Sequence, residues 1–397
     1  MNGVGRWVCC GVTHVLLAGA AEVAWNSRVP ANEASGPWRS MFKERDPRVE
    51  GWLRHPLDDR VSALRNQLER RNCMADMPTF SAADPEYNLT DATASFHRNG
   101  FLILEDALPD QLLHGLRNAS SYIMDKIFEV DPEGSFGGGA GKLPHRYSLG
   151  DSSATKSNFH LEAYAALVDL PTTTPLLQGI FGSPDYLAAG CGGDVVLAGA
   201  IEYQSLHPDA IWGQLEAEVS EYDVPPAVTA SRLQHSTMRA ACTACPARVF
   251  LAWAKINFVL QNLTATNGAM RIVPGSHRWR ERPPSLLEEP DWMRLNTLCP
   301  VKAGAAVFRD NRCWHGGTPN LAEGLRALPN VEYFPPGAMP SLGWLDRPTM
   351  PLEIWQQLSP LARHISRGLV VQPGEQIVGQ GIYSPASILD IMPFLRG

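Results

Sequence analysis

The chain has 397 residues, a net charge of −7 and 44% hydrophobic residues, including eleven tryptophans. This balance is typical of a folded protein with one large core or two modest ones, and it excludes an intrinsically disordered chain. No basic block accompanies the negative charge, so we expect no nucleic-acid partner.

The first 25 residues form a candidate targeting segment. Arg6 precedes a short apolar run ending at Ala18-Gly-Ala20, which matches a secretory signal peptide and is too short for a transmembrane span. An ordinary N-terminal helix fits the same residues, so secretion or targeting and a cytoplasmic location both stay open. Asn88-Leu-Thr90 and Asn262-Leu-Thr264 match the glycosylation acceptor, which matters only in a secreted chain.

Residues 26–85 are expected to form an N-terminal extension. Within it, Val61, Leu64 and Leu68 recur at helical spacing among charges, which predicts an amphipathic helix from about Asp58 to Arg71. The main domain is expected to span residues 86–397. It should open with a helix near 91–97, a strand at 101–104 and a helix over 109–128.

Two further motifs carry little chemistry. Gly134–Gly141 lacks the residue order of a nucleotide-phosphate loop, and a mobile loop is the better interpretation. The eight cysteines have irregular spacing, so we expect no disulfide framework and mostly reduced, partly buried thiols. Cys242-Thr-Ala-Cys245 lacks a clear second half of a zinc site, and a loop with two thiols is favoured.

Two stretches offer a histidine and an acid two residues apart. His160-Leu-Glu162 lies in a predicted helix over 158–170, where such residues do not share a face, so we reject it as a metal pair. His207-Pro-Asp209 follows an apolar, β-rich run. Proline favours an extended residue before it, and extended positions i and i+2 point the same way. His207 and Asp209 should therefore converge on one point.

The next 36 residues, 210–245, have few periodic runs and are expected to form a substrate lid. Residues 249–261 are the clearest strand. One face is apolar, and the other carries Lys255 and Asn257, which need partners in solvent or in a ligand pocket. Asn267-Gly268 predicts a tight hairpin, with residues 270–273 returning as the partner strand.

His315 is the candidate third ligand. It follows an apolar strand, a turn at Asp310-Asn311 and Trp314, and it precedes two glycines. A lone histidine beside a tryptophan is usually packed, but the upstream pair lacks the second histidine of a 2-His-1-carboxylate iron site. His277, in the turn Pro274–His277, is a competitor, and we favour His315. Later helices are expected at 286–295 and 351–367, with a closing strand at 332–334.

In order and spacing, these pieces resemble the phytanoyl-CoA dioxygenase-like family of Fe(II)/2-oxoglutarate-dependent oxygenases. The resemblance runs from about Phe96 to Tyr333. It rests on the stretch Phe96–Asp106, Gly192-Gly-Asp194, Leu206-His-Pro-Asp209, Asn267-Gly268, Pro274–His277, Trp314-His-Gly-Gly317 and Arg326. It implies a mainly β (α+β) fold with flanking helices around a double-stranded β-helix, or jelly-roll, core.

The resemblance also implies a site. His207, Asp209 and His315 would hold Fe(II), Arg326 would pair with a carboxylate of 2-oxoglutarate, and Asn257 would line that pocket. With O2, such an enzyme hydroxylates a small organic substrate, here lipid-like or a natural product. His277 lacks an arginine at the family's interval, which adds to the preference for His315.

Two other functions fit the same barrel. A cupin-like metal or small-molecule binding protein without turnover would not need Arg326. A halogenase of this architecture lacks the carboxylate ligand, so Asp209 argues against it. Neither the substrate nor the oligomeric state follows from the sequence.

Overall fold

Several segments of the chain are described by the computed structural model. They are residues 59–71, 73–130, 146–149, 157–197, 200, 203–209, 253–279, 281–322, 324–335 and 349–375. The candidate targeting segment, the glycine-rich loop, the expected lid and the pair Cys242/Cys245 lie outside these residues.

A seven-stranded sheet forms the larger layer, in the order β1-β2-β7-β5-β9-β4-β3. All of its pairings are antiparallel except β1 with β2. The strands are β1 (Thr79–Ser81), β2 (Phe101–Glu105), β3 (Arg146–Leu149), β4 (Leu187–Val196), β5 (Ala254–Phe258), β7 (Ala306–Asp310) and β9 (Arg326–Phe334). Because β1 belongs to this sheet, the sheet begins before residue 86.

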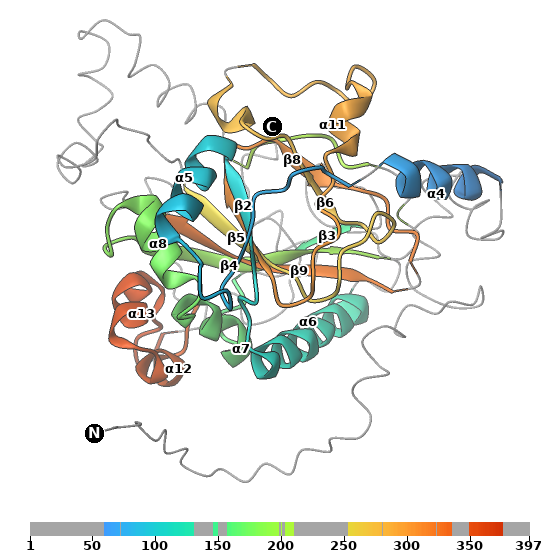
Figure 1. The fold of residues 1–397 in the computed structure, drawn as a ribbon. Helices are drawn as coiled ribbons and strands as arrows, with labels where there is room; N and C mark the ends of the chain where they lie inside the picture. The colour runs from blue at the N-terminus through green and yellow to red at the C-terminus, as the bar shows by residue number, and fades with distance from the viewer. Residues whose placement is uncertain are drawn as a thin grey trace, which may run out of the picture.

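A smaller sheet pairs β6 (Met270–Ile272) with β8 (His315–Gly317). Isolated bridges extend it on both sides, joining His207 to His315 and Thr297 to Arg271. Ile272 of this sheet packs in one buried cluster with Ile103 and Val307 of the large sheet. The two layers therefore enclose a core between them, as the expected jelly roll requires, and the mainly β fold with flanking helices is confirmed (Figure 1).

The expected hairpin after the long strand is wrong in one respect. Asn267-Gly268 does turn the chain, and Gly268 has the positive φ of 77° that favours glycine. However, β5 pairs with β7 and β9, whereas β6 pairs with β8 in the other sheet. The turn thus carries the chain from one layer to the other, because both edges of β5 are already occupied.

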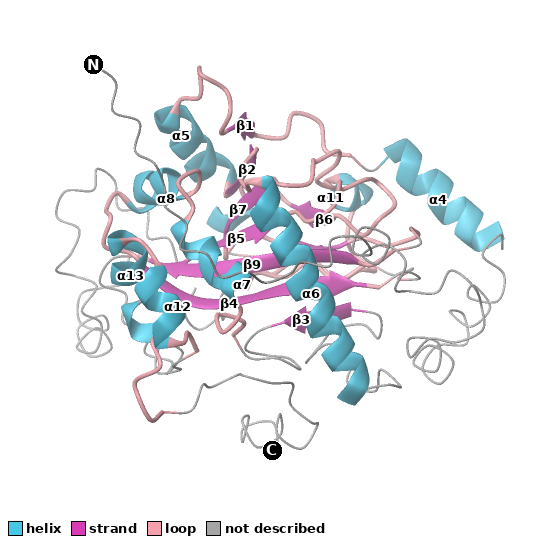
Figure 2. Ribbon diagram, turned by 90° about the horizontal axis from the view of Figure 1, so that it is seen from below, coloured by secondary structure: helices cyan, strands magenta, loops and turns pink. Residues whose placement is uncertain are grey.

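Helices cover the outer face of the large sheet. Figure 1 shows α6, α7, α12 and α13 on the side of this sheet opposite β6 and β8, and Figure 2 shows α6 lying across it. Between them lies the largest apolar cluster. The helices are α4 (Asp59–Arg71), α5 (Leu89–Asn99), α6 (Asp110–Val130), α7 (Glu162–Ala165), α8 (Thr174–Phe181), α11 (Asp291–Leu295), α12 (Leu352–Gln357) and α13 (Pro360–Ile365). Short 3-10 helices are η1 (Ala166–Asp169), η4 (Ser276–Arg278) and η5 (Arg367–Leu369).

Three expected helices are shorter or broken. The first begins only at Glu162 and continues as η1, and the acidic one is reduced to α11. The last is split, because Ser359 caps α13 with its side chain and Pro360 takes the first position, where it needs no hydrogen bond. Within the described part of the chain, no helix has the length and apolarity needed to cross a membrane.

The cysteines depart from expectation at one pair. Cys73 and Cys299 form a disulfide, while Cys191 and Cys313 are free and buried as expected. A parallel bridge between Cys73 and Thr297 brings the two sulfurs together. The contact spans 226 residues of sequence, so spacing alone could not indicate it. The bond ties the segment after α4 to the edge of the small sheet.

Replacing both partners, in Cys73→Ala/Cys299→Ala, should lower the free energy of unfolding by about 2–5 kcal/mol, because the long closed loop gains freedom in the unfolded chain. Denaturant titration of oxidised protein measures this. A reductant should shift the parent protein toward the variant and leave the variant unchanged. Equal stability of the parent and the variant would contradict the bond. Free thiols at Cys73 and Cys299 in the parent protein, assayed without reductant, would also contradict it.

Candidate metal centre

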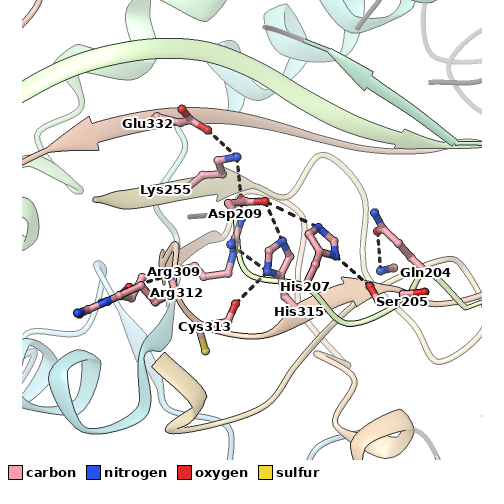
Figure 3. Close-up of polar contacts among 12 residues, drawn as sticks. Gln204, Ser205, His207, Asp209, Lys255, Arg309, Arg312, Cys313, His315 and Glu332 are labelled. Atoms are coloured by element: carbon pink, nitrogen blue, oxygen red, sulfur yellow. Dashed lines mark hydrogen bonds and ion pairs between the residues drawn. The ribbon is translucent and has the colours of Figure 1, made fainter. Parts of the chain in front are cut away.

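His207 and His315 are neighbours across the small sheet. The amide of His207 donates to the carbonyl of His315 at 3.0 Å, and the reverse bond measures 3.1 Å. Two residues beyond His207, the amide of Asp209 donates to the carbonyl of Asn311 at 2.8 Å. Because both segments are tied backbone to backbone, the side chains of His207, Asp209 and His315 meet at one place, as the extended His-Pro-Asp segment predicted (Figure 3).

Backbone carbonyls orient both imidazoles. Nδ1 of His207 lies 2.9 Å from the carbonyl of Ser205, and Nδ1 of His315 lies 3.0 Å from that of Cys313. A proton on each Nδ1 leaves both Nε2 atoms as acceptors or ligands. These lie 3.8 Å and 3.5 Å from Oδ1 of Asp209. The three donor atoms lie within 4.8 Å of one another, and no other such group occurs among the described residues.

Asp209 is held as a carboxylate. Burial alone would raise its pKa, but Lys255, Arg309 and His315 together lower the pKa well below its usual range. Nζ of Lys255 and Nη2 of Arg309 lie 3.0 Å and 2.7 Å from Oδ2. Asp209 and Glu332 in turn raise the pKa of Lys255 against the effect of burial. The negative charge needed by a divalent metal is therefore present at neutral pH.

His315 is neutral. Burial and the neighbouring Arg309 lower its pKa to about 3. Nη1 of Arg309 also lies 3.0 Å from Nδ1 of His315, but a protonated Nδ1 cannot accept from it. When Nδ1 donates to the carbonyl of Cys313, Nε2 carries no proton and is available to a metal. Two imidazoles and one carboxylate compose the 2-His-1-carboxylate set that suits Fe(II) with open positions.

Arg326 begins β9 and faces the space between the sheets. Alternation along β9 places it on the same face as Leu328, which packs in the core between the layers, and Glu332, which contacts Lys255 at 2.6 Å. Its Nε and Nη1 donate to the carbonyls of Gly268 and Asp194 at 2.6 Å and 3.0 Å. Burial lowers its pKa to about 10, so it is still charged at neutral pH. Among the described residues no carboxylate forms an ion pair with it.

A model of the phytanoyl-CoA dioxygenase (PhyH) family matches residues 96–328, more than half of the chain. The chain belongs to this family. It is therefore an oxygenase of the family's non-haem iron type, and the resemblance seen in the sequence is confirmed.

Three solved structures have a low similarity to this chain. The non-haem monooxygenase ThoJ, in its apo form, is 16% identical, with a TM-score of 0.40 over 62% of this chain and 77% of its own. AviO1 from Streptomyces viridochromogenes Tue57 is 18% identical, with a TM-score of 0.38 over 65% and 99%. The non-haem alpha-ketoglutarate-dependent carbocyclase SnoK from nogalamycin biosynthesis is 16% identical, with a TM-score of 0.39 over 66% and 91%.

Asn257 lies between the three-residue group and Arg326. It is opposite Asn330 on β9. Along β9, Asn330 lies between Arg326 and Glu332, so Asn257 also lies between these two residues. The side chain is fully buried, yet neither its oxygen nor its nitrogen has a hydrogen-bond partner within the described part of the structure. Buried amides are nearly always hydrogen-bonded. An absent polar ligand between the metal group and Arg326 would satisfy it, so these residues fit the family's cosubstrate.

The rejected candidates lie elsewhere. His277 sits in η4, where Nε2 lies 3.2 Å from the carbonyl of His97 and the ring covers Gly100. A Cβ on Gly100 would come within 2.4 Å of Nδ1 of His277, so the two residues pack as a structural contact. His160 lies in the turn before α7. Neither histidine joins the group of His207, Asp209 and His315.

Sequence reasoning missed one charged residue of the site, Arg309, and left another, Lys255, without its partners. Lys255 was expected to need partners, and the structure supplies Asp209 and Glu332. Arg309 contacts Asp209 from near the end of a fully buried strand. The available signal was a charge within an apolar strand, as at Lys255. Which strands lie next to one another had to be known before these charges could be paired.

We predict that Asp209→Asn weakens divalent-metal binding, by at least the roughly 10–100-fold that loss of a supporting group near a metal typically costs. The amide lacks the ligand charge, and Lys255 and Arg309 then add uncompensated positive charge. Titration with Mn(II) measures the effect. Asp169→Asn is the control, because Asp169 also accepts two hydrogen bonds, from Ser359, but lies away from the site. Unchanged Mn(II) affinity in Asp209→Asn would remove Asp209 from the ligand set.

Proposed function

We propose that this chain is an Fe(II)- and 2-oxoglutarate-dependent dioxygenase that hydroxylates a small organic substrate. The observation that carries the proposal is the placement of an ionised carboxylate and two imidazoles around one point, with the buried cation of Arg326 facing the same inner space. A protein that only bound a metal would not need that arginine.

His207, Asp209 and His315 would hold the iron. Bound iron, with 2-oxoglutarate and O2, supplies the oxidant that removes a hydrogen atom from the substrate, and the cosubstrate leaves as succinate and CO2. Arg326 would pair with the carboxylate of 2-oxoglutarate farther from the metal, since a guanidinium presents several donors in a fixed fork. Asn257 lies between the metal group and Arg326, so its side-chain amide would donate a hydrogen bond to the same molecule.

The apolar core beyond these groups would keep water out. Leu328 and Val307 pack between the sheets on the inner faces of β9 and β7. A dry cavity strengthens the charge contacts of the cosubstrate and protects a reactive site from side reactions. Family resemblance favours a lipid-like or natural-product substrate.

The alternative is a cupin-like protein that binds a metal or small molecule without turnover. Anaerobic loading with Fe(II), followed by addition of 2-oxoglutarate and O2, separates the two functions. The dioxygenase consumes 2-oxoglutarate and releases succinate, at a rate that rises with an accepted substrate. A screen of lipids, acyl thioesters and small natural products by succinate release would then identify the substrate class. Absence of 2-oxoglutarate binding to metal-loaded protein would favour the alternative.

Arg326→Ala should weaken 2-oxoglutarate binding by about 3–5 kcal/mol, the typical cost of removing one partner from a buried charged pair. Metal affinity should change little, because Arg326 does not contact the ligand group. Calorimetric titration of Mn(II)-loaded protein measures both. Arg117→Ala is a matched control, since Arg117 also donates to a backbone carbonyl, that of Leu260 at 2.8 Å, but comes from α6. Parental cosubstrate affinity in Arg326→Ala would exclude its assigned role.

A further inference from the structure

The two oxygens of Asp209 have different surroundings. Oδ1 faces Nε2 of both histidines. Oδ2 faces two cations, with Nη2 of Arg309 at 2.7 Å and Nζ of Lys255 at 3.0 Å (Figure 3). One oxygen is thus directed to the metal position, and the other is already occupied by charge-assisted hydrogen bonds, which are among the stronger ones in proteins.

Both cations come from the centre of the large sheet. Lys255 on β5 lies directly opposite Arg309 on β7 and Glu332 on β9, so the three residues form one row. Lys255 also contacts Glu332 at 2.6 Å, and the side chain of Arg309 is only 2% exposed. Strands paired on both sides fix this row. Neither cation can leave Oδ2 without uncovering a buried charge.

The number of Asp209 oxygens on the metal matters for the chemistry. Carboxylates bind metals through one oxygen or through both. A 2-His-1-carboxylate site leaves open positions for other ligands. The cosubstrate and O2 would need these positions, so a second oxygen of Asp209 on the metal would leave one fewer for them.

We propose that Lys255 and Arg309 are positioning residues that restrict Asp209 to one-oxygen metal binding and thereby keep a coordination position open. Glu332 balances the charge of Lys255 and does not itself touch Asp209. The consequence for 2-oxoglutarate rests on the proposed function. The binding mode of Asp209 does not, because it can be measured with a metal alone.

Both cations are needed to keep Oδ2 off the metal, so each of two variants that lack one cation should release it. Lys255→Met/Glu332→Gln removes one cation together with its second carboxylate, so no lone charge is left behind. Arg309→Met removes the other cation. Glu332→Gln alone is the matched control, because it alters the same row but leaves Lys255 and Arg309 on Asp209. Mn(II) affinity, 2-oxoglutarate affinity of the Mn(II)-loaded protein, thermal melts and crystal structures with Mn(II) are measured for each.

We expect both releasing variants to retain or improve Mn(II) affinity and to lose about tenfold or more in 2-oxoglutarate affinity, with both oxygens of Asp209 on Mn(II). The parent and Glu332→Gln should show one oxygen and similar cosubstrate affinities. If one releasing variant does not fold, the other decides. One-oxygen binding in a folded releasing variant would overturn the proposal. It would also be overturned if the releasing variants lost Mn(II) affinity and 2-oxoglutarate affinity equally and Glu332→Gln showed the same losses.

Failure of the proposed function gives a different result. A parent protein that binds Mn(II) but not 2-oxoglutarate is not the proposed dioxygenase. The Mn(II) crystal structures still test the positioning role in that case. A change from one oxygen in the parent to two in a releasing variant supports it, and an unchanged binding mode overturns it.

Discussion

The contact on which the site depends is the one that the Asp209 carboxylate makes with both sheets at once. Its Oδ1 faces histidines held by the small sheet, and its Oδ2 faces cations from the large sheet. A largely buried carboxylate without partners would be costly, and burial favours its protonated form. The cations keep it ionised, and the same contacts hold the segment of Asp209 against the centre of the large sheet.

The inner face of the large sheet changes in character along β9. Near Asp209 it is charged, with Glu332 beside Lys255. The next row presents the neutral amides of Asn330 and Asn257, and beyond it lie Leu328 and then Arg326. Like charges on paired strands normally repel. Here the Asp209 carboxylate accepts hydrogen bonds from both Lys255 and Arg309, which offsets their repulsion. The cation of Arg326 lies farther along β9, away from this row.

Features set by local chemistry could be predicted from the sequence. The alternation around Lys255 and Asn257 identified β5 and its polar inner face, and His207-Pro-Asp209 gave two converging side chains. Long-range pairing could not be predicted. A strand's own residues do not reveal its neighbours, so the partner of β6, the Cys73–Cys299 bond and the contact of Arg309 with Asp209 became visible only in the folded chain.

Two groups of buried charge in this fold call for different explanations. Buried ion pairs are weak evidence for stability, because apolar replacements of similar volume are often as stable. Arg271 and Glu289 form one such pair, with both side chains fully buried, and Arg271 also donates to the carbonyl of Gln204 at 2.6 Å.

Gln204 also forms two hydrogen bonds with Gly317 of β8. Its backbone amide donates to the carbonyl of Gly317 at 2.9 Å, and its side-chain oxygen accepts from the amide of Gly317 at 3.0 Å. The pair of Arg271 and Glu289 therefore fixes the backbone that leads to His207. The row of Arg309, Lys255 and Glu332 acts on a side chain instead, because it orients the carboxylate of Asp209. Backbone placement and side-chain orientation are separate requirements of one metal group, and these two groups of buried charge meet one each.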